Sequence, residues 1–214
     1  MFWDSGNTGS ATLNKNVTTY DATIKHSGNY SAKLQSQYVA LFGIGAFAAG
    51  NVFVGKFLKI DGTDGILRFG RPFTSRPSKL VLYYRYVAGT VDYSTLSELP
   101  KNSKDMGSIY IALGDWPHQT FEGETDIPVL VKTKPADRQL FDSNSSNVIG
   151  YGECILKEST EGEGLIKLEI PINYRSNRKP TDIILVGSAS RYGDYFTGST
   201  GSTLWLDDLE LIYE

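Results

Sequence analysis

The stretch GLIKLEIPINY at residues 164–174 decides the fold class. Apolar and polar side chains alternate in it: Ile166, Leu168, Ile170 and Ile172 against Lys167, Glu169 and Asn173. Successive side chains of a β-strand point to opposite faces of a sheet, whereas an amphipathic helix repeats its apolar residues every three to four positions. The stretch therefore predicts a strand with one buried face and one face in water.

Other stretches carry strand patterns as well. Residues 79–87, KLVLYYRYV, are apolar or aromatic on both sides, which predicts a strand covered on both faces. Further predicted strands span 30–38, 53–60, 108–113, 128–133, 149–156, 182–186 and 203–213. Turn sequences such as DGTDG separate them, and no window keeps helical spacing over three turns. We expect an all-β fold, a β-sandwich or jelly roll with little helix.

Length and composition limit the classes of protein. The 214 residues of even composition predict a single domain over residues 1–214. The 21 basic and 24 acidic residues nearly cancel and form no block, so we expect no nucleic-acid partner. No apolar run approaches the roughly 20 residues that span a bilayer, so no transmembrane segment is expected. The single cysteine, Cys154, is predicted to fill core space.

The usual catalytic motifs are missing from the sequence. His26 and His118 have no partner at zinc-ligand spacing, and there is neither a G-x-S-x-G elbow nor a phosphate-binding loop. A glycoside hydrolase needs a pair of carboxylates, for which the acids around residue 116 are candidates: Asp105, Asp115, Glu122 and Glu124. Acids in loops are usually solvated surface, and the sequence does not fix their separation.

Aromatic residues in loops give a clearer indication of function. A sugar ring has an apolar face of C–H groups and an edge of hydroxyls, which suits Tyr and Trp beside carboxylate, amide or guanidinium groups. The predicted stacking residues are Trp3, Trp116 and Tyr192. The predicted partners of sugar hydroxyls are Arg76, Asp115 and Asp194. Asn51 has two interpretations, a ligand contact or a turn, of which we favour the turn.

Two adjacent acids interrupt the predicted strand at 203–213. Asp207 falls on the side of Trp205, and Asp208 falls on the opposite side, so period-two alternation predicts that one acid is buried. A buried carboxylate stays charged only with a cation or several hydrogen-bond donors. Three explanations stay open: backbone N–H donors from a loop, an arginine partner, or a structural Ca²⁺ held through Asp207.

Three stretches in fixed order resemble a known family. They are AAGNVFVGKF at 48–57, FGRPFTSRPSKLVLYYRYVAG at 69–89, and SASRYGDYFTGSTGSTLWLDDLELIY at 188–213. Together they resemble the putative carbohydrate metabolism domain of Bacteroidetes, and the likeness runs from the Trp3 segment to Tyr213. Ala88 departs from the pattern, since a proline is expected in that turn.

The resemblance implies a galactose-binding-like jelly roll in a periplasmic or cell-surface protein. It also implies an N-terminal immunoglobulin-like domain before this one, so that residues 1–214 form the C-terminal part of a longer exported protein. The start MFWDSGN, which has no signal peptide, agrees with that expectation. The resemblance supplies a substrate class and no catalytic residues.

Three hypotheses about function follow. The first is a non-catalytic carbohydrate-binding module for an oligo- or polysaccharide, which needs no cofactor. The second is an interaction or structural domain without a glycan ligand, which a large flat apolar patch would favour. The third is a glycoside hydrolase that uses two of Asp105, Asp115 and Glu122, with one carboxyl of raised pKa.

Overall fold

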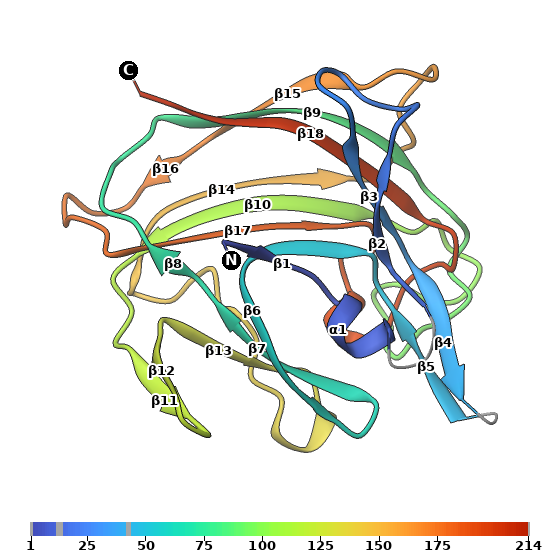
Figure 1. The fold of residues 1–214 in the computed structure, drawn as a ribbon, viewed down its shortest axis with the longest axis horizontal. Coiled ribbons are helices and arrows are strands. Elements are labelled where there is room, and N and C mark those ends of the chain that lie inside the picture. Colours follow the sequence, from blue (N-terminus) through green and yellow to red (C-terminus); the bar gives the residue numbers. More distant parts are fainter. Residues whose placement is uncertain (1, 12–14, 42–43, 214) are drawn as a thin grey trace.

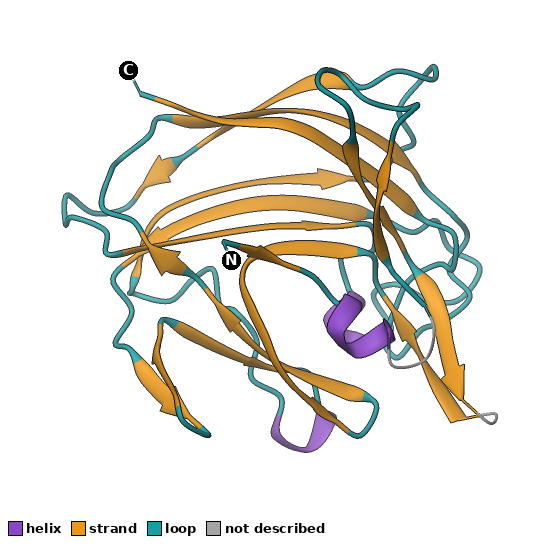
Figure 2. Cartoon of the chain, viewed as in Figure 1, coloured by secondary structure: helices purple, strands orange, loops and turns teal. Residues whose placement is uncertain are grey.

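The computed structural model describes residues 2–11, 15–41 and 44–213 (Figure 1). Strands dominate the chain, and every strand pair is antiparallel (Figure 2). The described helices are short: α1 (Asn7–Ser10) and the 3₁₀ turns η2 (Pro135–Asp137) and η3 (Gly193–Tyr195). The predicted all-β sandwich with little helix is confirmed. Among the described residues, no helix is long and apolar enough to cross a membrane.

The larger sheet has nine strands in the described part of the chain. Its main path runs β13-β7-β6-β17-β10-β14-β16, while β1 pairs with β6 and β8 pairs with β17. The bounds are β1 (Trp3–Asp4), β6 (Asn51–Asp61), β7 (Asp64–Phe69), β8 (Arg71–Pro72), β10 (Gly107–Gly114), β13 (Val129–Lys132), β14 (Val148–Leu156), β16 (Asn173–Tyr174) and β17 (Asp182–Ser188).

A second sheet of five strands covers one face of the first. Its order is β15-β9-β18-β3-β2, so the last strand of the chain lies in its middle. The bounds are β2 (Thr18–Asp21), β3 (Ser31–Gln35), β9 (Lys79–Val87), β15 (Ile166–Pro171) and β18 (Thr203–Ile212). Two hairpins stand apart, formed by β4 (Gln37–Leu41) with β5 (Ile44–Ala48) and by β11 (Gln119–Phe121) with β12 (Glu124–Ile127).

The main core lies between the two sheets. Leu82 and Leu204 from the five-stranded sheet and Ile109 and Ile111 from the nine-stranded sheet are fully buried there. Burial of such side chains is the largest favourable contribution to folding. Cys154 packs against this core as predicted, and burial raises the pKa of its thiol.

A second core lies on the other face of the nine-stranded sheet. Ala112 and Ile184, which alternate with the residues of the main core, pack there with Phe53 and Phe69. The central strands β10 and β17 are therefore buried on both faces, which explains their nearly continuous apolar sequences. The second core also forms the floor of the cavity described below.

Most of the predicted strands are confirmed, with three differences. The predicted strand at 164–174 divides between β15 in the five-stranded sheet and β16 in the nine-stranded sheet. The predicted strand at 30–38 is two strands, β3 and β4, because the chain turns at the buried Ser36, whose N–H donates to the carbonyl of Ser202 (3.0 Å). In the described part of the chain, no third sheet covers the outer face of β9. His26 stacks on Tyr83 there, and Arg85 lies over Trp205, so side chains supply the cover that the sequence pattern predicts.

Candidate functional site

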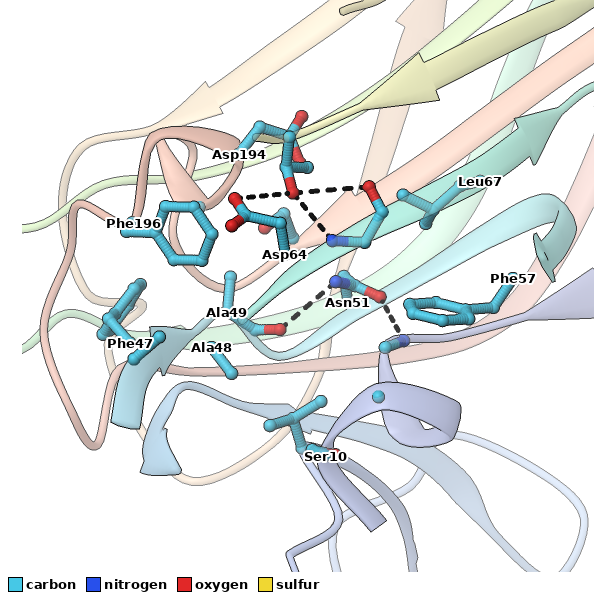
Figure 3. A pocket seen from close by; sticks show the side chains of 18 of the residues that line it. Ser10, Phe47, Ala48, Ala49, Asn51, Phe57, Asp64, Leu67, Asp194 and Phe196 are labelled. Atoms are coloured by element: carbon cyan, nitrogen blue, oxygen red, sulfur yellow. Dashed lines mark hydrogen bonds between the residues drawn. The ribbon is translucent and has the colours of Figure 1, made fainter. Parts of the chain in front are cut away.

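A cavity of about 270 Å³ opens beside the second core (Figure 3). Its wall comes from α1, from β5, from the β6–β7 hairpin and from the loop that follows β17. Most of the lining is apolar, including the rings of Phe47, Phe57 and Phe196. A concave apolar wall with a few polar groups is the usual form of a small-molecule site.

Small residues leave the space that the cavity occupies. Gly45, Ala48, Ala49 and Gly193 line it where larger side chains would fill it. Gly193 is also a position of close approach, since a Cβ there would lie 2.3 Å from the Cβ of Ala49. The loop 189–196 therefore packs directly on the end of β5 and presents the next residue, Asp194, to the cavity.

Two carboxylates, Asp64 and Asp194, line the same cavity (Figure 3). Asp194 keeps contact with solvent at the mouth, and no described residue donates a hydrogen bond to its carboxylate. The surrounding protein raises the pKa of Asp194 to about 6, with a smaller opposing effect of Arg138. Burial also raises the pKa of Asp64, and the nearby Asp61 adds to that effect.

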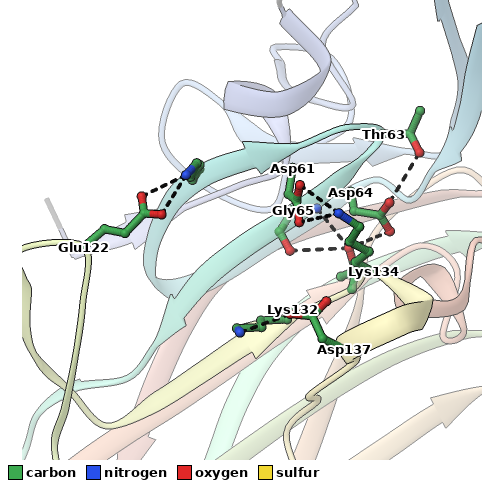
Figure 4. A network of polar contacts seen from close by, with 10 residues as sticks. Asp61, Thr63, Asp64, Gly65, Glu122, Lys132, Lys134 and Asp137 are labelled. Atoms are coloured by element: carbon green, nitrogen blue, oxygen red, sulfur yellow. Dashed lines mark hydrogen bonds and ion pairs between the residues drawn. The ribbon is translucent and has the colours of Figure 1, made fainter.

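A polar network holds Asp64 at the edge of the cavity (Figure 4). The hydroxyl of Thr133 accepts a hydrogen bond from the N–H of Gly65 (2.9 Å) and donates to the Asp64 carboxylate (3.5 Å). Lys134 pairs with Asp61 (3.0 Å), which raises the pKa of the lysine. The β6–β7 hairpin is thereby tied to the chain after β13, and Asp64 has a fixed position.

Guanidinium groups and tyrosines lie in and beside the loop that presents Asp194. Arg191 lines the cavity and pairs with Glu153. Arg138 lies over the ring of Tyr195, 4.7 Å from its centroid. Tyr192 meets Tyr195 edge to face at 6.5 Å. Planar cations and aromatic rings therefore lie close to the cavity, and one of them, Arg191, lines it.

Two polar side chains of the wall, Asn51 and Ser10, differ in their hydrogen bonding. The amide of Asn51 accepts from the N–H of Gly6 (2.8 Å) and donates to the carbonyl of Ala49 (3.2 Å). Asn51 is the first residue of β6 and lines the cavity, so the turn that we favoured for it is not confirmed. Ser10, by contrast, is buried, and its hydroxyl has no hydrogen-bond partner. An unpaired buried hydroxyl costs free energy unless a water or a ligand bonds to it.

Residues 1–212 match the family model described as "Putative carbohydrate metabolism domain". The chain belongs to this family. No curated protein matches the sequence of this family member.

Two solved structures resemble this member of the putative carbohydrate metabolism domain family. One is described as a putative glycoside hydrolase from Bacteroides thetaiotaomicron VPI-5482, with 23% identity, a TM-score of 0.71, and coverage of 100% of this chain and 63% of that chain. The other is described as a putative glycoside hydrolase from Bacteroides vulgatus ATCC 8482, with 24% identity, a TM-score of 0.71, and coverage of 99% and 85%. These likenesses support the sandwich fold.

The predicted stacking residues lie in different parts of the family domain. Trp116 does not project from a loop as expected. It is only 8% exposed and packs in the second core, because its ring folds back over Gly114 and meets Phe141 edge to face. Trp3 lies in β1 and packs against the main core. Tyr192 does not line the cavity itself, but its ring lies 5.9 Å from the guanidinium of the lining residue Arg191.

The predicted hydroxyl-binding residues are also separated. Asp194 lines the cavity. Arg76 donates to the carbonyl of Ser176 (2.9 Å) and stacks on Tyr174 at 4.0 Å, so it braces the chain after β16. Both terminal nitrogens of Arg76 donate to backbone carbonyls, and Arg76 does not line the cavity, so a ligand contact of Arg76 stays a prediction. Asp115 forms an exposed ion pair with Arg178 (2.7 Å) and lies outside the cavity lining.

The three acids proposed for hydrolysis do not share a cleft. Asp105 is fully buried and accepts hydrogen bonds from Ser190 (2.6 Å) and from the N–H of Ser199 (2.8 Å). Glu122 pairs with Lys59 (2.7 Å) (Figure 4). Neither acid lines the cavity, and neither does Asp115. The structure therefore contradicts this choice of residues.

The paired acids of β18 lie at a β-bulge. The register shifts after Asp207, and Asp208 has a left-handed backbone (φ 47°), so both acids reach the surface. The prediction that one of them is buried is wrong, because period two ends at the bulge. Asp207 accepts the N–H of His26 (2.7 Å) and of Ser27, which is the first of the three explanations. In the described ranges no three His, Cys, Asp or Glu side chains cluster as metal ligands.

Sequence reasoning missed Asp64 and the cavity itself. Asp64 belongs to DGTDG, which reads as a turn, and it does occupy the β6–β7 turn. The raised pKa of Asp194 was not visible either, although its loop was singled out. A signal was available in the glycines and alanines at 45–50, whose small size allows other segments to approach.

Proposed function

We propose that this domain is a non-catalytic carbohydrate-binding module whose ligand, an oligo- or polysaccharide, occupies the cavity of Figure 3. One observation carries the proposal: the rings of Phe57 and Phe196 share the cavity wall with the carboxylates of Asp64 and Asp194. A sugar needs this combination, because its C–H face packs on apolar surface while its hydroxyls bond to carboxylates.

Unsatisfied groups in the wall support the same ligand. Neither the carboxylate of Asp194 nor the buried hydroxyl of Ser10 has a hydrogen-bond partner in the described chain. A purely apolar ligand over Asp194 would displace water from its carboxylate without replacing the hydrogen bonds, which is costly. A ligand that carries hydroxyls can donate to this carboxylate, so a saccharide fits better than a lipid.

Calorimetry tests the proposal. We expect a panel of oligosaccharides to contain a ligand with a Kd of roughly 10 μM to 1 mM, or about −4 to −7 kcal/mol. Ala48→Trp places a large ring in the cavity and should abolish that binding. Asp115→Asn is the matched control, because Asp115 is partly exposed and does not line the cavity. Equal binding by wild type and Ala48→Trp would place the ligand elsewhere, and no binding by the wild type would favour a structural domain.

A second candidate function is glycoside hydrolysis by Asp64 and Asp194. The specific observation is that both carboxyls face one cavity and that both have raised pKa values. A hydrolase needs one acid that is protonated near neutral pH beside a second carboxyl. The pKa of about 6 for Asp194 makes it the acid and Asp64 the partner in this scheme.

Reducing-sugar release separates the two functions. A hydrolase would release sugar from a bound oligosaccharide, and Asp194→Asn would stop the release while leaving binding in place. A binding module would release none with either protein. We also propose a periplasmic or cell-surface location, which the Bacteroides sources of the similar structures support.

A further inference from the structure

A second, shallow pocket lies where β7, β8 and the β11–β12 hairpin meet. Its polar residues are two arginines, one histidine and two acids: Arg68, Arg71, His118, Glu124 and Asp126. It shares no lining residue with the cavity of the proposed function. Any ligand here is therefore bound independently.

Arg71 is a partly buried cation without a carboxylate partner. Its Nη2 donates to the carbonyl of Gly55 (2.9 Å), and its buried Nε has no partner in the described chain. Burial lowers the pKa of Arg71, and the neighbouring Arg68 lowers it further. Buried charges in proteins are normally paired, whereas this guanidinium has no carboxylate in direct contact, and Glu124 and Asp4 attract it only from a distance.

Arg68 does not have enough negative charge around it either. It is 8% exposed, and its Nη1 lies 3.2 Å from Glu124. Lys56 holds the same carboxylate more closely, at 2.7 Å. The Nε of Arg68 is buried without a partner. One carboxylate thus serves two cations beside the unpaired Arg71.

His118 adds a third nitrogen group at the pocket. Its Nε2 lies 2.9 Å from Asp182, which is fully buried and also accepts from the hydroxyl of Thr181 (2.7 Å). Asp182 thereby fixes the orientation of the imidazole ring. The Nδ1 of His118 has no partner among the described residues.

We propose that this pocket binds an oxyanion, the carboxylate of an acidic sugar or a sulfate group, on Arg71 and Arg68. The Nη1 of Arg71 is neither among the buried atoms nor hydrogen-bonded to a described residue, so it is the group of this guanidinium that can donate to an oxyanion, beside the Nη2 that donates to Gly55. The two acids of the pocket have other partners. Glu124 is paired with Lys56 and Arg68, and the exposed Asp126 accepts a hydrogen bond from the hydroxyl of Thr125 (3.0 Å).

The test is calorimetry with three separate probes: sodium glucuronate, sodium sulfate and neutral glucose. The proposal predicts saturable binding of glucuronate, of sulfate or of both. Binding of glucuronate alone identifies a carboxylate ligand, and binding of sulfate alone identifies a tetrahedral anion. Arg71→Gln should weaken the binding at least tenfold. Arg76→Gln is the matched control, since Arg76 stacks on Tyr174 outside the pocket, and it should leave the binding unchanged.

Two results would overturn the proposal. One is the absence of anion binding to the wild type at millimolar concentration. The other is equal loss of binding in the Arg71 and Arg76 variants. Thermal unfolding checks the fold of each variant, and a rise in Tm with the anion in wild type but not in Arg71→Gln gives an independent readout. The cavity variant Ala48→Trp should bind the anion normally, so this site and the saccharide cavity are tested separately.

Discussion

Gly193→Ala should destabilise the domain through a single contact. The new Cβ would lie 2.3 Å from the Cβ of Ala49, far inside van der Waals contact, and the next nearest atoms are the Ala49 Cα at 3.7 Å and the Ser188 Oγ at 4.0 Å. Overpacking of this kind costs about 1–3 kcal/mol. The loop would have to move away from β5, and Asp194 would move with it.

Removing the other methyl group should reverse the effect. Ala49→Gly deletes the atom that clashes, so the double variant Ala49→Gly/Gly193→Ala has only ordinary contacts at this position. Ala49→Gly alone should cost about 0.5–1 kcal/mol because glycine loses more conformational entropy on folding. The double variant should be more stable than the sum of the single variants predicts, by about 1–2 kcal/mol.

Denaturant unfolding of the four proteins measures this coupling. Binding of the oligosaccharide found by calorimetry gives a second readout: affinity should fall at least tenfold in Gly193→Ala and recover in the double variant. A coupling below about 0.5 kcal/mol would refute the reasoning, because the two positions would then act independently. If the double variant recovers stability but not the affinity for the oligosaccharide, the link between this contact and the position of Asp194 is refuted.

Three further predictions concern other parts of the domain. Trp116→Ala should cost about 3–5 kcal/mol in denaturant unfolding, as expected for a ring in the second core, while the folded fraction still binds the ligand. Because the pKa of Asp194 is raised to about 6, the folded state holds its proton longer than the unfolded state. The stability from this group is therefore present below about pH 4 and lost as the pH rises towards 6, and Asp194→Asn should flatten the Tm profile in that range. Hydrogen bonds from His26 and Ser27 lower the pKa of Asp208. The stability that this carboxylate contributes should therefore be present at neutral pH and lost as the pH falls below the usual pKa of an aspartate. Asp208→Asn should lack this loss of Tm in acid.

Local patterns predicted the sheets well. The apolar run at 79–87 became β9, and the alternation at 164–174 became β15 followed by the short β16, which pairs in the other sheet. The period of side chains along a strand does not depend on which strand is its neighbour, so alternation predicts the strands but not the change of sheet. The β7 strand was missed. It begins with Asp64 and Gly65 and contains Arg68, and it is a strand because β6 and β13 pair with it on either side.

Side-chain direction was the weaker part of the prediction. The proline after Trp116 marks a loop, but the ring turns back because Gly114 leaves space over the end of β10. At 207–208, the β-bulge turns the side chains of Asp207 and Asp208 away from the faces that strict alternation predicts. The cavity depends on contacts between α1, the β6–β7 hairpin and the loop 189–196, which are far apart in the sequence, so Asp64 could not be associated with Asp194 in advance.

Chemical-shift mapping of the backbone amides during an oligosaccharide titration tests the central claim most directly. Our account predicts that the largest shifts cluster on the cavity wall, at Ala48, Asp64 and the loop 189–196, with saturation at the calorimetric Kd. Shifts that cluster instead on the outer face of the five-stranded sheet, or no shifts with any sugar that binds in calorimetry, would contradict it.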